Sequence, residues 1–103
     1  MLDHIGIPTT DFERSKAFFV QALAPLGWSV AMEAPGHGVG LGKAHKPALW
    51  LAPGAPAQGV SPLHLAFTAD DRAQVDAFHQ AALAAGGRDN GPPGIRAHYH
   101  PNY

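Results

Sequence analysis

The sequence predicts a single α+β domain built from two related modules, each with the element order β-α-β-β-β. The main observation is a repeat: Asp3–Gly27 aligns with Leu63–Gly87, sixty positions later in the chain. The matched positions include His4 with His64, Asp11 with Asp71, and Gly27 with Gly87. In both copies a short apolar run precedes an amphipathic stretch of helical spacing that stops at glycine. Such internal similarity predicts a repeated structural unit.

The composition is that of one globular domain and excludes several classes of function. The 103 residues are 46% hydrophobic, which allows one modest core. The formal net charge is −1 without a Lys/Arg cluster, which argues against nucleic acid or an anionic membrane as a partner. The chain has no cysteine, so it has neither disulfides nor thiolate metal ligands. Neither a leader nor a long apolar run is evident, and a cytoplasmic location is therefore expected.

The first module is predicted over residues 1–55. An apolar strand at 2–8 is followed by a helix that runs from residue 12 to a stop at Gly27, with apolar residues on one face. Three further strands are predicted at 28–32, 39–42 and 48–52, separated by turns rich in glycine and proline.

The second module is predicted over residues 63–103, after a Pro- and Gly-rich linker at about 53–62. It begins with a strand at 63–68, continues with a helix that ends at Gly86-Gly87, and starts another strand at 95–98. By the spacing of the repeat, the counterpart of strand 48–52 would fall beyond Tyr103. We therefore expect the second module to be incomplete and a C-terminal segment to be absent from this sequence.

The paired copies resemble the vicinal oxygen chelate superfamily, which contains glyoxalases, bleomycin-resistance proteins and extradiol dioxygenases. The resemblance lies in Leu2-Asp3-His4-Ile5-Gly6-Ile7, with Asp11 and Phe18-Phe19 behind it, and in Leu63-His64-Leu65-Ala66-Phe67. The resemblance covers essentially the whole chain. The chain is similar to a small glyoxalase-like member of the superfamily that is truncated at its C-terminus. The resemblance implies a curved mixed sheet with the helices outside.

The resemblance further implies a divalent metal (Fe, Zn, Mn or Ni) held at the centre of the sheet by His4 and His64. Two imidazoles and one carboxylate leave positions open for a substrate with adjacent oxygens. The expected activity is that of a metal-dependent lyase, isomerase or ring-cleaving dioxygenase. The carboxylate ligand would lie beyond Tyr103. Without the repeat, a histidine in an apolar strand is more often a hydrogen-bonded core residue than a ligand.

An alternative function is a metal-free small-molecule binding protein of the bleomycin-resistance kind, which holds an antibiotic between two subunits. It is favoured by the strand at 48–52, which carries no acidic residue. In both cases the resemblance implies a small-molecule ligand and a homodimer.

Four further side chains are candidates for the site. His98 and His100 would share one face of a strand by its period of two and act as general acid or base or contact the substrate. Trp50 and Tyr99 would contact the substrate. The alternatives are a surface loop with aromatic caps for the tail residues and a core position for Trp50. His79 is expected on an exposed helix face.

Overall fold

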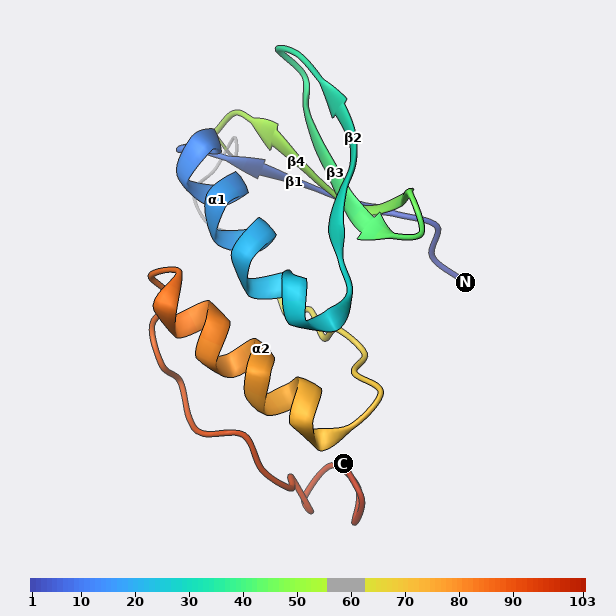
Figure 1. Cartoon of the computed structure of the whole chain (residues 1–103), viewed down its shortest axis with the longest axis vertical. Helices are drawn as coiled ribbons and strands as arrows, with labels where there is room; N and C mark the ends of the chain where they lie inside the picture. The colour runs from blue at the N-terminus through green and yellow to red at the C-terminus, as the bar shows by residue number, and fades with distance from the viewer. Residues whose placement is uncertain (56–62) are drawn as a thin grey trace.

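The fold is built on a curved mixed sheet, as described by a computed structural model of residues 1–55 and 63–103 (Figure 1). In the described residues the sheet has four strands in the order β1-β4-β3-β2. They are β1 Ile5–Thr9, β2 Ser29–Ala34, β3 Gly38–Lys43 and β4 Lys46–Pro53. β1 pairs parallel with β4, whereas the β2–β3 and β3–β4 pairs are antiparallel. The first strand in the sequence therefore lies at an edge of the sheet, next to the last strand of its module.

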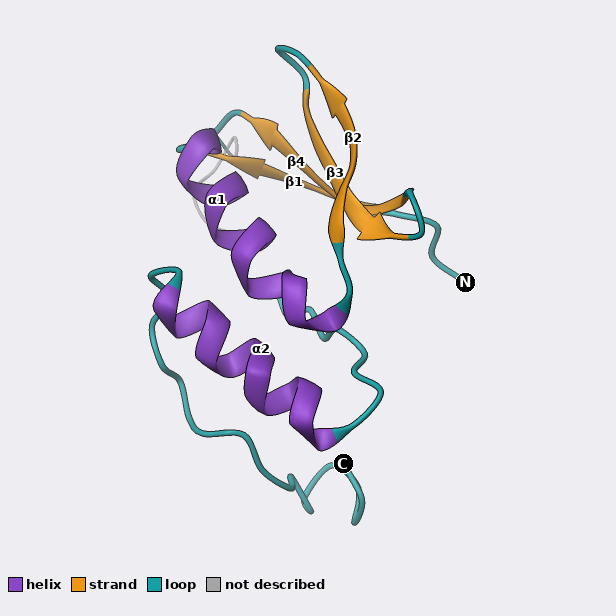
Figure 2. Ribbon diagram, in the orientation of Figure 1, coloured by secondary structure: helices purple, strands orange, loops and turns teal. Residues whose placement is uncertain are grey.

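Two α-helices start at aspartate caps and lie on the same side of the sheet (Figure 2). α1 spans Phe12–Leu23, and Asp11 accepts a hydrogen bond from the backbone N–H of Arg14. α2 spans Arg72–Ala84, and Asp71 accepts one from the N–H of Gln74. These bonds satisfy backbone donors that the first helical turn leaves free, so Asp11 and Asp71 are the N-cap residues of the two helices.

A short 3-10 turn, η1 Ala24–Leu26, continues α1 and ends at Gly27. Gly27 has a φ of +80°, a left-handed conformation that glycine adopts without steric cost. The predicted glycine stop is therefore confirmed.

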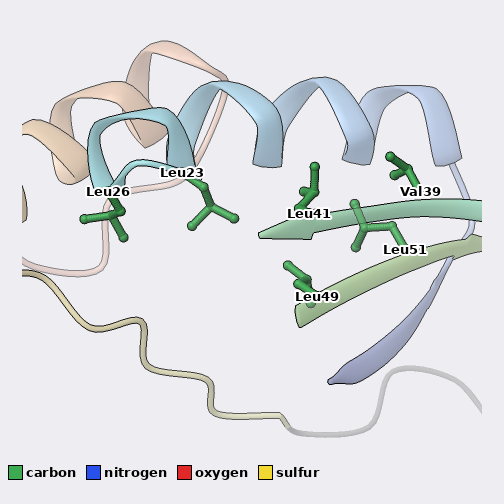
Figure 3. Close-up of a cluster of buried hydrophobic side chains, with 6 residues drawn as sticks. All are labelled: Leu23, Leu26, Val39, Leu41, Leu49 and Leu51. Atoms are coloured by element: carbon green, nitrogen blue, oxygen red, sulfur yellow. The ribbon is translucent and has the colours of Figure 1, made fainter. Parts of the chain in front are cut away.

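The core lies between α1 with η1 and the sheet (Figure 3). Its buried members are Leu23, Leu26, Val39, Leu41, Leu49 and Leu51. The four sheet residues alternate with residues that point the other way, as the pleat of a strand requires. α2 packs against α1 and η1 and contributes Phe78 to the rim of the core. The second module thus reaches the core through its helix and through Phe67 and Ala69, which precede the helix.

The opposite side of the sheet carries one row of aligned residues from all four strands. Across the ladder Gly6 pairs with Trp50, Trp50 with Gly40, and Gly40 with Met32. These residues alternate with the core-facing ones, so they lie on the face away from α1. We call this surface the open face, because in residues 1–55 and 63–103 both α-helices lie on its other side.

The predicted α+β class is confirmed, and the five predicted elements of the first module each appear with bounds within a few residues. Two predictions for the second module are wrong. Residues 63–68 belong to no sheet, although their burial alternates as in a strand. Residues 95–98 form no strand either, because the backbone there closes into a turn: the N–H of Tyr99 donates to the carbonyl of Arg96 at 2.8 Å.

Candidate functional site

A cluster of three polar side chains lies where the chain enters β1. Nδ1 of His4 lies 3.0 Å from Oδ1 of Asp3, and Nζ of Lys46 lies 3.0 Å from Oδ2 of the same carboxylate. The hydrogen bond from His4, and after it the one from Lys46, lowers the pKa of the Asp3 carboxyl below its usual value. All three side chains are exposed, at 57% for His4, 70% for Asp3 and 67% for Lys46. The cluster is therefore accessible to a molecule from solvent.

His4 directly precedes β1 and is in phase with Gly6 of the open face. The residues out of phase with it, Ile5 and Ile7, are half-buried toward the core side. The same alternation recurs around His64, which is exposed, while Leu65 and Phe67 are half-buried. Phe67 stacks edge-on against Trp28 at a centroid distance of 5.4 Å and packs on the core. Both histidines of the repeat thus have the phase of residues that point away from the core.

The described residues do not bring a complete set of metal ligands together. Within residues 1–55 and 63–103 no group of three or more His, Asp or Glu side chains is arranged to hold a metal ion. Sites for Zn, Fe or Mn normally use at least three protein ligands. His4 and His64 offer nitrogen donors of a suitable kind, but this donor set alone does not fit a complete metal centre.

Trp50 lies at the middle of the open face, on β4. A Cβ built on Gly40 would lie 2.6 Å from Cβ of Pro47 and 3.0 Å from Cε2 of the indole, so the pyrrolidine of Pro47 and the indole ring both lie against β3 at this point. A Cβ built on Gly6, on the other side of Trp50, would meet nothing within 4 Å. The indole therefore has one side against a glycine backbone and leaves space above β1. Trp28, by contrast, packs against the core.

The C-terminal tail brings its aromatic residues together by turns. The rings of His98 and Tyr99 lie 4.3 Å apart, and those of Tyr99 and Tyr103 lie 5.6 Å apart. Nδ1 of His100 accepts a hydrogen bond from the N–H of Asn102. The prediction that His98 and His100 share a strand face is wrong, because residues 97–99 form a turn rather than a strand. Their catalytic role and the substrate contact of Tyr99 stay predictions.

His79 of α2 contacts Asp89 in the segment that follows the helix. The prediction of an exposed position is wrong: the side chain is half-buried, and Nε2 lies 3.2 Å from Oδ1 of Asp89. The hydrogen bond from the N–H of Gly91, and to a smaller extent the one from His79, lowers the pKa of the Asp89 carboxyl. This histidine has a structural partner and is not a candidate for the site.

A cavity of about 730 Å³ lies apart from the open face, between α2 and the tail. Its lining comes from the first turns of α2 and the segment before it, including Phe67, Arg72 and Val75, and from tail residues such as Ile95 and Tyr103. His4, His64 and Trp50 are not part of it. Sequence reasoning did not foresee this cavity, because the tail was expected to enter a sheet.

Two residues of the site, Asp3 and Lys46, were also missed by sequence reasoning. The position of Asp3 directly before His4 was a usable signal, since carboxylates often orient a neighbouring imidazole. Lys46 lies 43 positions from Asp3 and gave no such signal.

Comparison with known proteins identifies the family. The model of the glyoxalase/bleomycin resistance protein/dioxygenase superfamily matches residues 1–99. The chain belongs to this superfamily. A similar solved structure is that of a glyoxalase/bleomycin resistance protein from Albidiferax ferrireducens T118, with a TM-score of 0.68 and 29% identity over 93% of this chain and 79% of that one. Comparison with curated proteins finds no match.

Membership of the glyoxalase/bleomycin resistance protein/dioxygenase superfamily confirms the resemblance seen in the sequence. The match to the family model covers both halves of the repeat, including the segment around His64, which belongs to no sheet in the described residues. In the described ranges no helix has the length and apolar character needed to cross a membrane.

Proposed function

We propose that this glyoxalase-like domain binds a small organic molecule on the open face of its sheet. The observation that carries the proposal is the row from Gly6 through Trp50 and Gly40 to Met32, in which an indole stands between two residues without side chains. Small-molecule sites are lined mainly by apolar and aromatic side chains, with a few polar groups that fix the orientation of the ligand. At one end of β1 the cluster of Asp3, His4 and Lys46 supplies those polar groups.

Metal-dependent chemistry on a substrate with adjacent oxygens is the first form of this function. It is supported by the repeat, which gives His4 and His64 the same phase, and by the carboxylate at Nδ1 of His4, an arrangement common around metal-bound imidazoles. A bound divalent metal would act as a Lewis acid toward the paired oxygens. Because the described donors fall short of three, this form requires a further donor from outside the described residues, such as a partner subunit.

Binding without a metal, as in a bleomycin-resistance type of protein, is the second form. It is supported by β4, whose open-face positions carry Ala48, Trp50 and Ala52 and no carboxylate. In this form Trp50 would stack on the ligand, while His4 and Lys46 would contact its polar groups. The two forms share the binding surface and differ in whether a metal is needed.

The binding surface is tested by titrating isotope-labelled protein with a library of small ring compounds and α-hydroxycarbonyl compounds. Chemical-shift changes are expected at the amides of Gly6, Gly40 and Met32 and at the indole N–H of Trp50. Trp50→Ala should abolish these changes, whereas Trp28→Phe, at the second tryptophan, should preserve them. Binders that shift only residues of the α2–tail cavity, such as Val75, would contradict the proposal.

Metal content separates the two forms. Protein purified without chelators or a metal-binding tag is expected, in the metal-dependent form, to carry a transition metal that is lost in His64→Ala and retained in His37→Ala. His37 is a matched control because it is an exposed turn histidine outside the repeat. Protein that stays metal-free after reconstitution with Fe, Zn, Mn and Ni, yet binds ring compounds on the open face, has the metal-free function.

A further inference from the structure

We infer that Asp3 is a positioning residue that fixes the tautomer of His4, so that Nε2 is the unprotonated nitrogen available to a ligand. Asp3 Oδ1 lies 3.0 Å from Nδ1 of His4. An ionised carboxylate only accepts hydrogen bonds, so the hydrogen of the neutral imidazole must lie on Nδ1. Nε2 then carries a lone pair, and His4 acts as an acceptor or an electron-pair donor rather than as a hydrogen-bond donor.

Asp3 and His4 are neighbours in the sequence, and Lys46 adds to their contact a second partner of Asp3 from a distant part of the chain. Its Nζ lies 3.0 Å from Oδ2 of Asp3, so each carboxylate oxygen has a separate partner. Lys46 is the first residue of β4 and directly follows the turn of the β3–β4 hairpin. It pairs with Lys43, the last residue of β3, across this two-residue turn. The hairpin therefore contacts Oδ2 of the carboxylate through Lys46, while His4 contacts Oδ1. This arrangement sets the orientation of Asp3 from a part of the sheet that is distant in sequence.

The tautomer restricts the chemistry of the ligand atom that meets His4. A neutral imidazole with hydrogen on Nδ1 offers Nε2 to a hydroxyl or an N–H of the ligand, or to a cation. A bare carbonyl or ether oxygen would find no donor there. The inference rests on the proposed function for its biological meaning, but the protonated nitrogen can be measured in the protein alone.

The test is nitrogen NMR of the histidine rings near pH 8, where an ordinary imidazole with a pKa of about 6.5 is neutral. The signals of His4 are assigned by their loss in His4→Gln. In the native protein Nδ1 of His4 is expected at the frequency of a protonated ring nitrogen and Nε2 at that of an unprotonated one. In Asp3→Ala this preference should disappear or invert, and in Asp3→Glu a longer carboxylate should restore part of it.

Lys46→Met is the matched control. It removes the second partner of Asp3 but leaves the hydrogen bond to His4, so Nδ1 should remain the protonated nitrogen, with a weaker preference. His45, exposed in the neighbouring turn, should give the same signals in every variant. A native His4 protonated on Nε2, or signals that are the same in native protein and Asp3→Ala, would overturn the inference. A fixed Nδ1–H tautomer in a protein that binds neither ring compounds nor metal would instead leave the inference standing and contradict the proposed function.

Discussion

Leu51→Ala is expected to destabilise the domain by about 2–5 kcal/mol, because it removes a large side chain from the centre of the core. Leu51 is 0% exposed and lies in β4 between Ile7 of β1 and Val39 of β3. Truncation would leave a cavity lined by residues that the sheet holds in place. Since domains of this size are stable by about 5–15 kcal/mol, the loss would be a large share of the total. Urea unfolding followed by circular dichroism measures it.

Leu2→Ala is the matched control for this prediction. It makes the same chemical change at a residue that is 79% exposed, and we expect it to alter the free energy of unfolding by no more than about 0.5 kcal/mol. Equal effects of the two substitutions would show that the packing around Leu51 does not hold in solution.

Gly42→Ala is expected to cost about 1–3 kcal/mol or more, because the added methyl group has no space. A Cβ at residue 42 would overlap the carbonyl oxygen of Lys46 and lie 2.9 Å from its carbonyl carbon. These are backbone atoms of the paired strand, so relief of the overlap requires the β3–β4 hairpin to open. The fall in the midpoint of thermal or urea unfolding measures the cost.

Gly6→Ala provides the comparison within the same sheet. A Cβ at residue 6 would meet nothing within 4 Å, so we expect stability that is unchanged or slightly raised by the lower entropy of the unfolded chain. If Gly42→Ala were as stable as Gly6→Ala, the close β3–β4 pairing at this point would be wrong.

Local patterns predicted the parts of the fold that depend on neighbouring residues. The helical spacing after Asp11 and Asp71 and the stop at Gly27 are local signals, and all three were confirmed. The prediction of a strand at 95–98 was wrong, since these four residues by themselves do not reveal the turn that Arg96 and Tyr99 close. A segment with strand propensity forms a strand only where a partner strand pairs with it, and in the described part of the chain residues 63–68 join no sheet.

The site was predicted only as far as alternation along a strand allows. His4 and Trp50 could be assigned to one face of the sheet once their strands were recognised. The contact between Asp3 and Lys46 could not be predicted from the sequence. It depends on the parallel pairing of β1 with β4, which places the N-terminus beside the β3–β4 turn. Such register is a property of the whole sheet.

The position of β1 at the sheet edge also has a consequence for the order of folding. β2, β3 and β4 are joined by short turns, whereas Ile5 of β1 pairs with Leu49, far along the chain. Closing the longer loop costs more entropy, so we expect the hairpins to form first and β1 to dock late. Accordingly, Ile7→Val should mainly speed unfolding and Leu41→Ala should slow folding in stopped-flow measurements. The imidazole of His4, which directly precedes β1, would then meet Asp3 and Lys46 in their final arrangement only in the last step of folding. Any event that detaches the edge strand would disrupt this cluster first.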